Sequence, residues 1–388
     1  MAEQKSSYNN AGRAMRSRTP TVRSEKNKKS EESGGSNALA RKSSLTATGR
    51  QDLTSKMELP TCKEKSRYNI EDPRHKWATK VLEKTAMRVV LKEFRDMKDW
   101  KPDPFLINLS KKNSEKNRYD DIHCLDHTRV VLKERPSGKD YIHASWMVMP
   151  DGFRYISTQG PLKETLDDFW HMIYTEKCSV IVMLCQWDEG AHEKCRRYYQ
   201  RDRVENYGDY KVRVKKDQEE PFKTIRLTLL ECQRKGSKEW RTVYHFWCYE
   251  WEDHAGPLDA GPVVSMHKMS LEKAEGNPIV VHCSAGIGRT ATFVGINYAS
   301  QRIQEDPDLK MVDILRGLRK MRHRAIQSQL QYAFLYVCVF ELFCQEGVLS
   351  RDGKVKEFRN KYAGISKNIL AKMKEAQEKE REKEKTRA

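Results

Sequence analysis

The sequence predicts an α/β protein built around one cysteine loop, and three stretches support this prediction. Residues 279–282 form an apolar, mainly β-branched run, which is typical of a buried strand. A loop with two glycines follows, and residues 291–296 can begin a helix. Residues 180–184 form a second continuous apolar run, and residues 77–97 repeat apolar side chains at near-helical spacing. Such elements are expected to form a sheet with helices packed around it.

The loop after residue 282 combines features that suit anion binding and nucleophilic attack. Backbone N–H groups converge at a helix N-terminus, where the helix dipole adds partial positive charge. Gly286 and Gly288 permit the positive φ angles that curl amides inward, and Arg289 adds a planar fork for two oxyanions. Such a field favours Cys283 as a thiolate, so the loop can bind a phosphate-like dianion and also attack it. The alternative is a strand that ends in an inert cysteine.

The composition limits the compartment and the partners. The chain has 388 residues, a net charge of +18 and ten cysteines, so anionic partners are favoured. Cysteines within apolar runs, such as Cys185 and Cys338, are typical of reduced core thiols. No cofactor and no metal are expected, because the cysteines near residues 178–195 lack the spacing of a zinc knuckle. The sequence offers no apolar span and no leading signal region, which predicts a cytoplasmic location.

Residues 282–290 resemble the signature H-C-S-A-G-x-G-R-[ST]-G of the protein tyrosine phosphatases, in the tyrosine-specific non-receptor branch. Ala291 stands where the family usually has glycine. The resemblance implies a single phosphatase domain with a highly twisted mixed β-sheet flanked by helices, and the cysteine loop between a strand and a helix N-terminus. Residues 290–293 and the basic tails are also similar to small nematode-type members.

Two further loops carry the resemblance to the substrate pocket. Residues 116–121 resemble the family's K-N-R-Y-x-D loop, which implies that Tyr119 stacks on the substrate ring and Asp121 accepts hydrogen bonds from the substrate backbone. Residues 189–195 resemble E-x-G-x-x-K-C, which implies that Glu189 orients the guanidinium of Arg289 and that Lys194 lies in the same site. The glycine of that motif is displaced by one position, to residue 190.

Residues 251–257 resemble the mobile acid loop W-P-D of the family. Phosphoryl transfer from tyrosine needs an acid for the leaving oxygen and later a base for water, and Asp253 is the candidate for both. Glu252 replaces the usual proline, so we expect a larger open ensemble and a lower activity than in a W-P-D enzyme.

Of the last two motifs, one supplies amide side chains, and the other lies in a region that departs from the family pattern at two residues. Residues 322–332 resemble R-x-x-M-[VI]-Q-[TS]-x-x-Q-[YF], which implies that Gln327 positions the hydrolytic water and that Gln331, four residues on, shares its helical face. Residues 140–145 resemble D-Y-I-N-A-[SN], with His143 in place of asparagine, and Cys124 replaces a common proline. A structural role is expected for His143.

The resemblance implies hydrolysis of phosphotyrosine through a cysteinyl-phosphate. Cys283 attacks phosphorus, Thr290 helps the sulfur to leave, and His282 acts on the cysteine through its hydrogen bonds. The equatorial oxygens are bound by Arg289 and by the loop itself, made of Ser284, Ala285, Gly286, Ile287 and Gly288. The alternatives are a phosphotyrosine-binding pseudophosphatase with weak turnover, a dual-specificity or lipid phosphatase, and a scaffold that uses its tails.

The chain is predicted to divide into three parts. Residues 1–75 form a disordered basic tail, residues 76–348 the phosphatase domain, and residues 349–388 a charged, partly helical tail with a helix over 372–385. The expected partners are phosphotyrosine-containing proteins, and the basic tails could also meet an acidic partner or a membrane surface. Nucleic acid is not expected as a partner, and the protein is expected to be a monomer.

Overall fold

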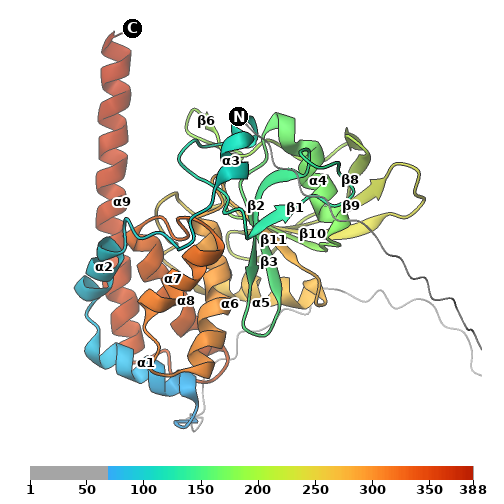
Figure 1. Ribbon diagram of the computed structural model, residues 1–388. Coiled ribbons are helices and arrows are strands. Elements are labelled where there is room, and N and C mark those ends of the chain that lie inside the picture. The colour runs from blue at the N-terminus through green and yellow to red at the C-terminus, as the bar shows by residue number, and fades with distance from the viewer. Residues whose placement is uncertain (1–68, 388) are drawn as a thin grey trace, which may run out of the picture. The chain divides into compact units, whose positions relative to one another are not determined.

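The structure is a computed structural model that describes residues 69–387. A nine-stranded mixed sheet lies at its centre, in the spatial order β1-β2-β3-β11-β4-β10-β9-β8-β7 (Figure 1). The strands β3, β11, β4 and β10 are parallel to one another, and the outer pairs are antiparallel. The bounds are β1 Arg129–Val131, β2 Tyr141–Val148, β3 Arg154–Thr158, β4 Val180–Met183, β7 Glu205–Tyr207, β8 Tyr210–Phe222, β9 Ile225–Arg234, β10 Arg241–Cys248 and β11 Ile279–His282; a separate hairpin pairs β5 Asp188–Glu189 with β6 His192–Glu193.

Helices cover both faces of the sheet. Helices α5 and α6 contact the central strands, whereas α4 contacts β7 and β8. Helices α6, α7 and α8 lie together on one side of the strands in Figure 1. The bounds are α1 Pro73–Lys84, α2 Met87–Asp96, α3 Asn108–Lys112, α4 Leu166–Thr175, α5 Gly261–Ala274, α6 Arg289–Glu305, α7 Met311–Met321, α8 Gln329–Gln345 and α9 Lys354–Arg387, with short 3-10 turns at Ser114–Lys116 and Lys163–Thr165.

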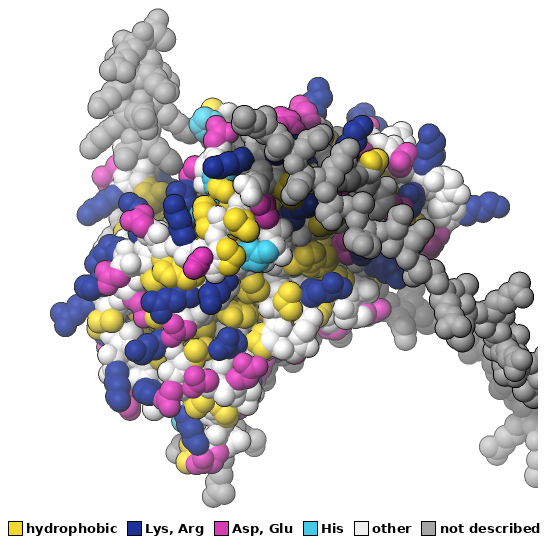
Figure 2. All heavy atoms as spheres, in the orientation of Figure 1, with side chains coloured by type: hydrophobic (Ala, Val, Ile, Leu, Met, Phe, Trp, Pro, Cys, Tyr) yellow, Lys and Arg dark blue, Asp and Glu magenta, His cyan; other side chains and the backbone are white. Residues whose placement is uncertain are grey.

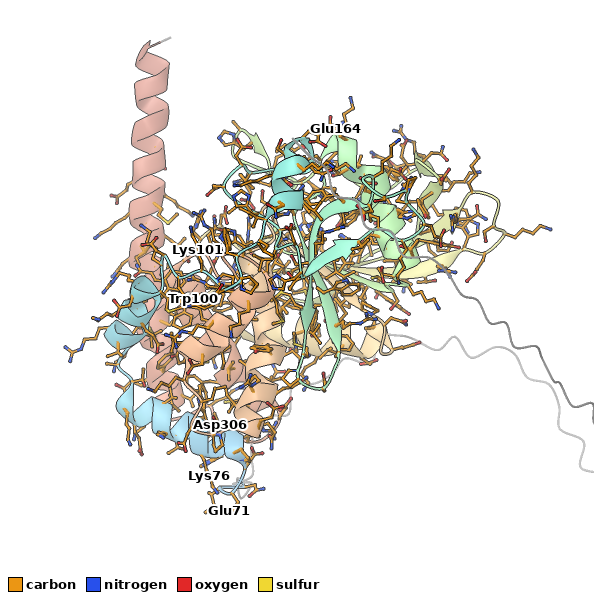
Figure 3. The ribbon with its side chains drawn as sticks, viewed as in Figure 1. Glu71, Lys76, Trp100, Lys101, Glu164 and Asp306 are labelled. Atoms are coloured by element: carbon orange, nitrogen blue, oxygen red, sulfur yellow. The ribbon has the colours of Figure 1, made fainter. Side chains whose placement is uncertain are left out.

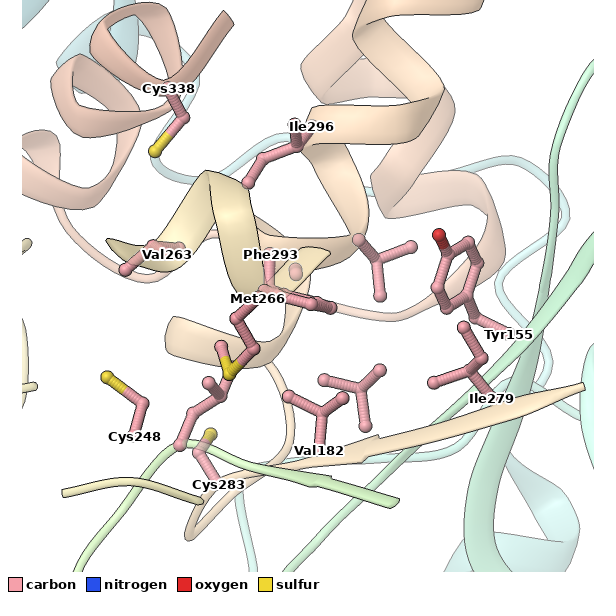
Figure 4. Close-up of a cluster of buried hydrophobic side chains, with 14 of the residues drawn as sticks. Tyr155, Val182, Cys248, Val263, Met266, Ile279, Cys283, Phe293, Ile296 and Cys338 are labelled. Carbon is pink, nitrogen blue, oxygen red and sulfur yellow. The ribbon is translucent and has the colours of Figure 1, made fainter. Parts of the chain in front are cut away.

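The central strand β11 is buried on both faces, as its apolar run predicts. Successive side chains of a strand point to opposite faces. Ile279 lies in the same buried cluster as Met266 of α5 and Phe293 of α6 (Figure 4), whereas the ring of His282 contacts Phe169 of α4. The residue that follows β11, Cys283, therefore leaves the sheet between two covering layers.

The predicted single helix over residues 77–97 is wrong, because the structure has two helices there. Thr85 and Ala86 adopt extended conformations that end α1 and begin α2. Each short helix places its own apolar face on α8: Trp77 packs on the aromatic rings of that helix, and so does Phe94. The predicted strands over residues 180–184 and 279–282 agree closely with β4 and β11, and the helix expected at residues 291–296 lies within α6.

The ends of the described chain pack onto the same core. Helix α1 begins at Pro73, and Lys76 in its first turn pairs with Glu71 at 2.6 Å (Figure 3). Helix α9 includes the predicted residues 372–385, and its Val355, Phe358 and Tyr362 are buried in the main hydrophobic core. The domain boundaries at residues 75 and 348 stay predictions, and residues 1–68 of the predicted tail over residues 1–75 lie outside the described residues. Among residues 69–387, no helix has both the length and the apolar composition needed to cross a bilayer.

Candidate active site

The cysteine loop connects the end of β11 to the first residue of α6. The side chain of Cys283 is buried at the edge of the hydrophobic cluster in Figure 4. The backbone N–H of Gly286 donates to its Sγ at 3.3 Å. Gly286 has a φ of 69°, and a Cβ there would lie 2.1 Å from the carbonyl oxygen of Thr158. Only glycine fits this position, and the loop amides turn toward the sulfur at a helix N-terminus.

Arg289 is held from two sides and is almost fully buried, with 1% of its surface exposed. Its Nη1 donates to Glu189 Oε1 at 2.5 Å and to the carbonyl of Trp251 at 3.0 Å. Its Nη2 lies 3.3 Å from Asp253 Oδ1. Burial alone would lower the pKa of Arg289, but the negative charge of Asp253, followed by that of other acidic neighbours, raises it above its ordinary value. The guanidinium therefore stays charged.

At the start of α6, two buried polar atoms have no hydrogen-bond partner among the described residues. They are Nε of Arg289 and the hydroxyl of Thr290, at the first two positions of α6. A buried donor without a partner costs free energy, so such atoms usually have a ligand or water to meet. Both atoms lie beside the cysteine loop at the N-terminus of α6, and an oxyanion bound there would accept hydrogen bonds from them.

Asp253 completes the charged group around Arg289. Its carboxylate lies 3.6 Å from the ammonium of Lys194, which is itself 3.9 Å from Glu189. Burial alone would raise the pKa of Asp253, but the charges of Arg289, then His254 and Lys194, hold this pKa below its ordinary value. The carboxyl is therefore ionised while the site is empty of substrate.

The predicted pocket wall lies against the cysteine loop. The hydroxyl of Tyr119 is 2.8 Å from Ser284 Oγ, and its ring packs on the small cluster of Ile122, Ala285 and Ile287. Asp121 is brought to the same region, but it is exposed and forms an ion pair with Arg324. Arg324 occupies a position where the motif allows any residue, so the sequence alone does not indicate this contact.

The predicted glutamines meet at Gly288, though not on one helix. Helix α8 begins at Gln329, because Ser328 caps it by accepting from the backbone N–H of Gln331 at 3.1 Å. Gln327 therefore lies in the preceding loop, which corrects the predicted shared helical face. Its backbone N–H donates to Gln331 Oε1 at 3.0 Å. A Cβ on Gly288 would lie within 3.0 Å of both side chains, so this glycine permits their close approach.

His282 reaches Cys283 through the backbone. Its Nδ1 lies 3.2 Å from the carbonyl oxygen of Cys283, and its Nε2 lies 2.9 Å from the hydroxyl of Tyr198. Tyr198 in turn contacts His245 at 2.6 Å. Neither Tyr198 nor the carbonyl of Trp251 belongs to a local sequence pattern that would indicate its place in the site.

A mixed sheet with a thiol at a helix N-terminus, a clamped arginine and a facing carboxylate defines the class of cysteine-dependent phosphatases. A family model described as protein-tyrosine phosphatase matches residues 113–341, which is more than half of the chain. The chain therefore belongs to the protein-tyrosine phosphatase family, as its sequence predicts.

Individual relatives agree with this assignment. The chain is 33% identical over 283 residues to human tyrosine-protein phosphatase non-receptor type 9, covering 67% of this chain and 47% of that protein. It is 34% identical over 261 residues to tyrosine-protein phosphatase 99A of Drosophila melanogaster, covering 64% and 20%. It therefore spans less than half of the length of these two relatives. It is 30% identical over 315 residues to non-receptor type 20 of Rattus norvegicus, covering 79% and 72%.

The fold is also shared with solved structures. The catalytic domain of human protein tyrosine phosphatase non-receptor type 18 superimposes with a TM-score of 0.63 at 31% identity, covering 69% of this chain and 100% of that one. A structure of the same phosphatase with HER2 phosphopeptides gives a TM-score of 0.64 at 30% identity, covering 70% and 100%. The predicted single domain with a twisted mixed sheet is confirmed.

Proposed function

We propose that this chain hydrolyses phosphotyrosine in proteins through a cysteinyl-phosphate intermediate. The observation that carries the proposal is the guanidinium of Arg289, buried between Glu189 and Asp253 at the exit of the loop that holds Cys283. A fixed fork beside a thiol at a helix N-terminus suits a transferring phosphoryl group, whose charge spreads over three equatorial oxygens. The loop amides of residues 284–288 bind those oxygens together with Arg289.

In the first step the thiolate of Cys283 attacks phosphorus while the bond from phosphorus to the tyrosine oxygen breaks. Asp253 gives its proton to the departing oxygen, so that a neutral phenol leaves. The arriving phosphate takes over the fork of Arg289, and its negative charge favours the protonated form of the nearby carboxyl. Lys194 and Glu189 hold the carboxyl and the guanidinium in place during this exchange.

In the second step water attacks phosphorus while the bond from sulfur to phosphorus breaks. Gln327 orients the water with the support of Gln331, and Asp253 accepts its proton. The unpartnered hydroxyl of Thr290 donates to the departing sulfur. His282 keeps the strand end and the Cys283 carbonyl fixed through its bond to that carbonyl. Inorganic phosphate and the free thiolate are the products of this step.

Substrate choice follows from the wall formed by Tyr119. Its ring is held upright by the Ser284 contact and by packing on Ile122, which gives the site a depth that suits phosphotyrosine better than phosphoserine. A structure of the related non-receptor type 18 holds phosphopeptides, which supports phosphotyrosine-containing proteins as the partners.

The nine cysteines of the described residues are free and buried, which supports a reducing, cytoplasmic compartment. We keep acidic partners or a membrane surface as proposed contacts of the basic tails.

The test is turnover of a tyrosine-phosphorylated peptide by the purified chain, with Cys283→Ser as the matched control. We expect turnover in the wild type and a loss of at least about 10³-fold in the variant, which keeps the oxyanion site but lacks the thiolate. A wild type that binds the peptide without releasing phosphate would overturn the proposal and indicate a pseudophosphatase. Equal turnover of phosphoserine and phosphotyrosine peptides would instead contradict the role of Tyr119.

A further inference from the structure

Arg322 lies directly behind the cysteine loop and is completely buried. It follows the last residue of α7, and all five of its N–H groups have an acceptor. These acceptors are the carbonyl oxygens of Gly286 at 3.1 Å and Ala285 at 3.2 Å, His143 Nδ1 at 3.0 Å, Cys124 Sγ at 3.1 Å and Ser145 Oγ at 3.2 Å. A guanidinium satisfied in this way holds its neighbours in one geometry.

The contact to Ala285 controls an amide that faces the nucleophile. The peptide unit between residues 285 and 286 is planar, so its C=O and its N–H point in opposite directions. Arg322 binds the C=O of this unit, and the N–H of the same unit donates to Cys283 Sγ at 3.3 Å. The second contact, to the carbonyl of Gly286, fixes the next peptide unit in the same way. Arg322 thus determines where two loop amides point.

A fully buried positive charge needs a negative partner, and one candidate is in contact. Within residues 69–387, no carboxylate forms an ion pair with Arg322. The ring of His143 accepts from Arg322 at Nδ1 and contacts the carbonyl of Ile122 at Nε2, which fits a neutral ring. A second proton on His143 would add positive charge and would increase the need for an anion. Tyr141 stays neutral, because burial raises its pKa. Cys124 is then the one acid in contact with the guanidinium.

We propose that Cys124 is a buried thiolate that neutralises Arg322 and so acts as a positioning residue for the anion-binding loop. The role in catalysis rests on the proposed phosphatase function. Cys124 and His143 are two of the residues that depart from the family pattern noted above, and both of these departures meet at this one guanidinium. The chain therefore holds its loop with an ionisable pair where the motif has neutral residues.

The surroundings of Cys124 favour the charged sulfur. Burial alone would raise the pKa of Cys124, whereas the positive charge of Arg322 in contact with the sulfur lowers it. The hydroxyl of Ser145 also lies 3.9 Å from the sulfur and can donate to it. A neutral thiol would instead donate to the carbonyl of Ala144, which is 3.7 Å away and thus farther than Arg322 Nη1.

The first test compares two replacements in the full chain. Cys124→Ser keeps a small polar group but removes the acid, and we expect kcat/KM for a phosphotyrosyl peptide to fall about tenfold, mainly in kcat. Cys124→Asp restores a negative charge, and we expect it to recover most of that loss. Cys232→Ser is the control, because Cys232 is a buried neutral thiol of β9 whose pKa burial raises to about 12. Unchanged kcat/KM in Cys124→Ser, or equal losses in folded Ser and Asp variants, would overturn the proposal.

The second test does not depend on turnover or on the folding of the Asp variant. The ultraviolet absorbance of thiolates is titrated with pH in Cys283→Ser and in the double variant Cys124→Ser/Cys283→Ser. We expect Cys283→Ser to show a thiolate that titrates below the ordinary pKa of a thiol, and the double variant to lack this titration. Identical titrations would show that Cys124 is a neutral thiol and refute the proposal, even if the wild type proves active. A silent wild type with the expected titration would refute only the proposed function.

Discussion

At the scale of single residues, Asp253 is the group whose charge must change during the proposed reaction. Its ion pairs with Arg289 and Lys194 keep it ionised before substrate binds, so a proton must be gained in the complex. A carboxyl that must be protonated makes the reaction slower as pH rises above its pKa. Because the pKa of Asp253 in the free enzyme lies below its ordinary value, the wild type should lose kcat/KM as pH rises from the acidic range toward alkaline pH.

Asp253→Asn removes this proton without changing the size of the side chain. We expect kcat to fall by about 10²- to 10³-fold, and the decline of kcat/KM toward alkaline pH to disappear. The measurement is the pH profile of both proteins with one phosphotyrosyl peptide. A variant with the same alkaline decline as the wild type would show that another group supplies the proton.

At the scale of elements, the acid loop of residues 251–257 is anchored by hydrogen bonds at Trp251 and His254, and Glu252 between these anchors is exposed. The carbonyl of Trp251 accepts from Arg289 at 3.0 Å, and Ser328 donates to the carbonyl of His254 at 2.5 Å. Glu252 lies exposed between these anchors, in the position of the family's proline. The backbone freedom of this residue is lost each time the loop reaches the site.

Glu252→Pro should therefore raise kcat. A proline compatible with the loop removes about 0.4–1 kcal/mol of that entropy cost, which corresponds to a roughly two- to fivefold increase. Glu252→Ala is the matched control, because it removes the charge and leaves the backbone free. If the alanine variant gains as much, charge rather than flexibility limits the loop. A proline variant with the same or a lower kcat would contradict the argument.

Helix α9 contributes apolar side chains to the core, although most of its sequence is charged. Phe358 packs edge-on against Phe340 of α8, with ring centroids 5.2 Å apart. We expect Phe358→Ala to lower the free energy of unfolding by about 3–5 kcal/mol, because it leaves a cavity in the core. Lys361→Ala, at an exposed position of the same helix, should change it by no more than about 0.5 kcal/mol. Urea unfolding of both variants would decide, and equal losses would mean that the helix is not docked in solution.

These elements show which parts of the fold were predictable from sequence. The strands and the cysteine loop carry strong local patterns, such as the continuous apolar run of β11 and the glycine required at Gly286. The break at Thr85 and the start of α8 at Gln329 depend on packing and capping that a periodic pattern does not encode. The partners of Arg322 come from positions at least 36 residues away, and no local pattern joins them.

At the scale of the whole molecule, charge should govern how substrates arrive. The chain carries a net charge of +18, and Figure 2 shows Lys and Arg side chains mixed with Asp and Glu over the visible face of the described residues. A positive molecule attracts an anionic phosphopeptide over a distance set by the Debye length, about 10 Å at 0.1 M salt and about 3 Å at 1 M. Beside the pocket, Asp120 is exposed next to Tyr119 and adds a local negative charge.

The position of acidic residues in a peptide should therefore decide their effect. We expect acidic residues distant from the phosphotyrosine to raise kcat/KM severalfold at low salt and to lose this advantage at about 1 M. Acidic residues next to the phosphotyrosine should lower kcat/KM modestly, because they meet Asp120, and Asp120→Asn should remove this penalty alone. Peptides of equal net charge that differ only in where the acidic residues lie would separate the two effects. If both peptides respond equally to salt and to Asp120→Asn, the long-range field and the rim charge do not act separately.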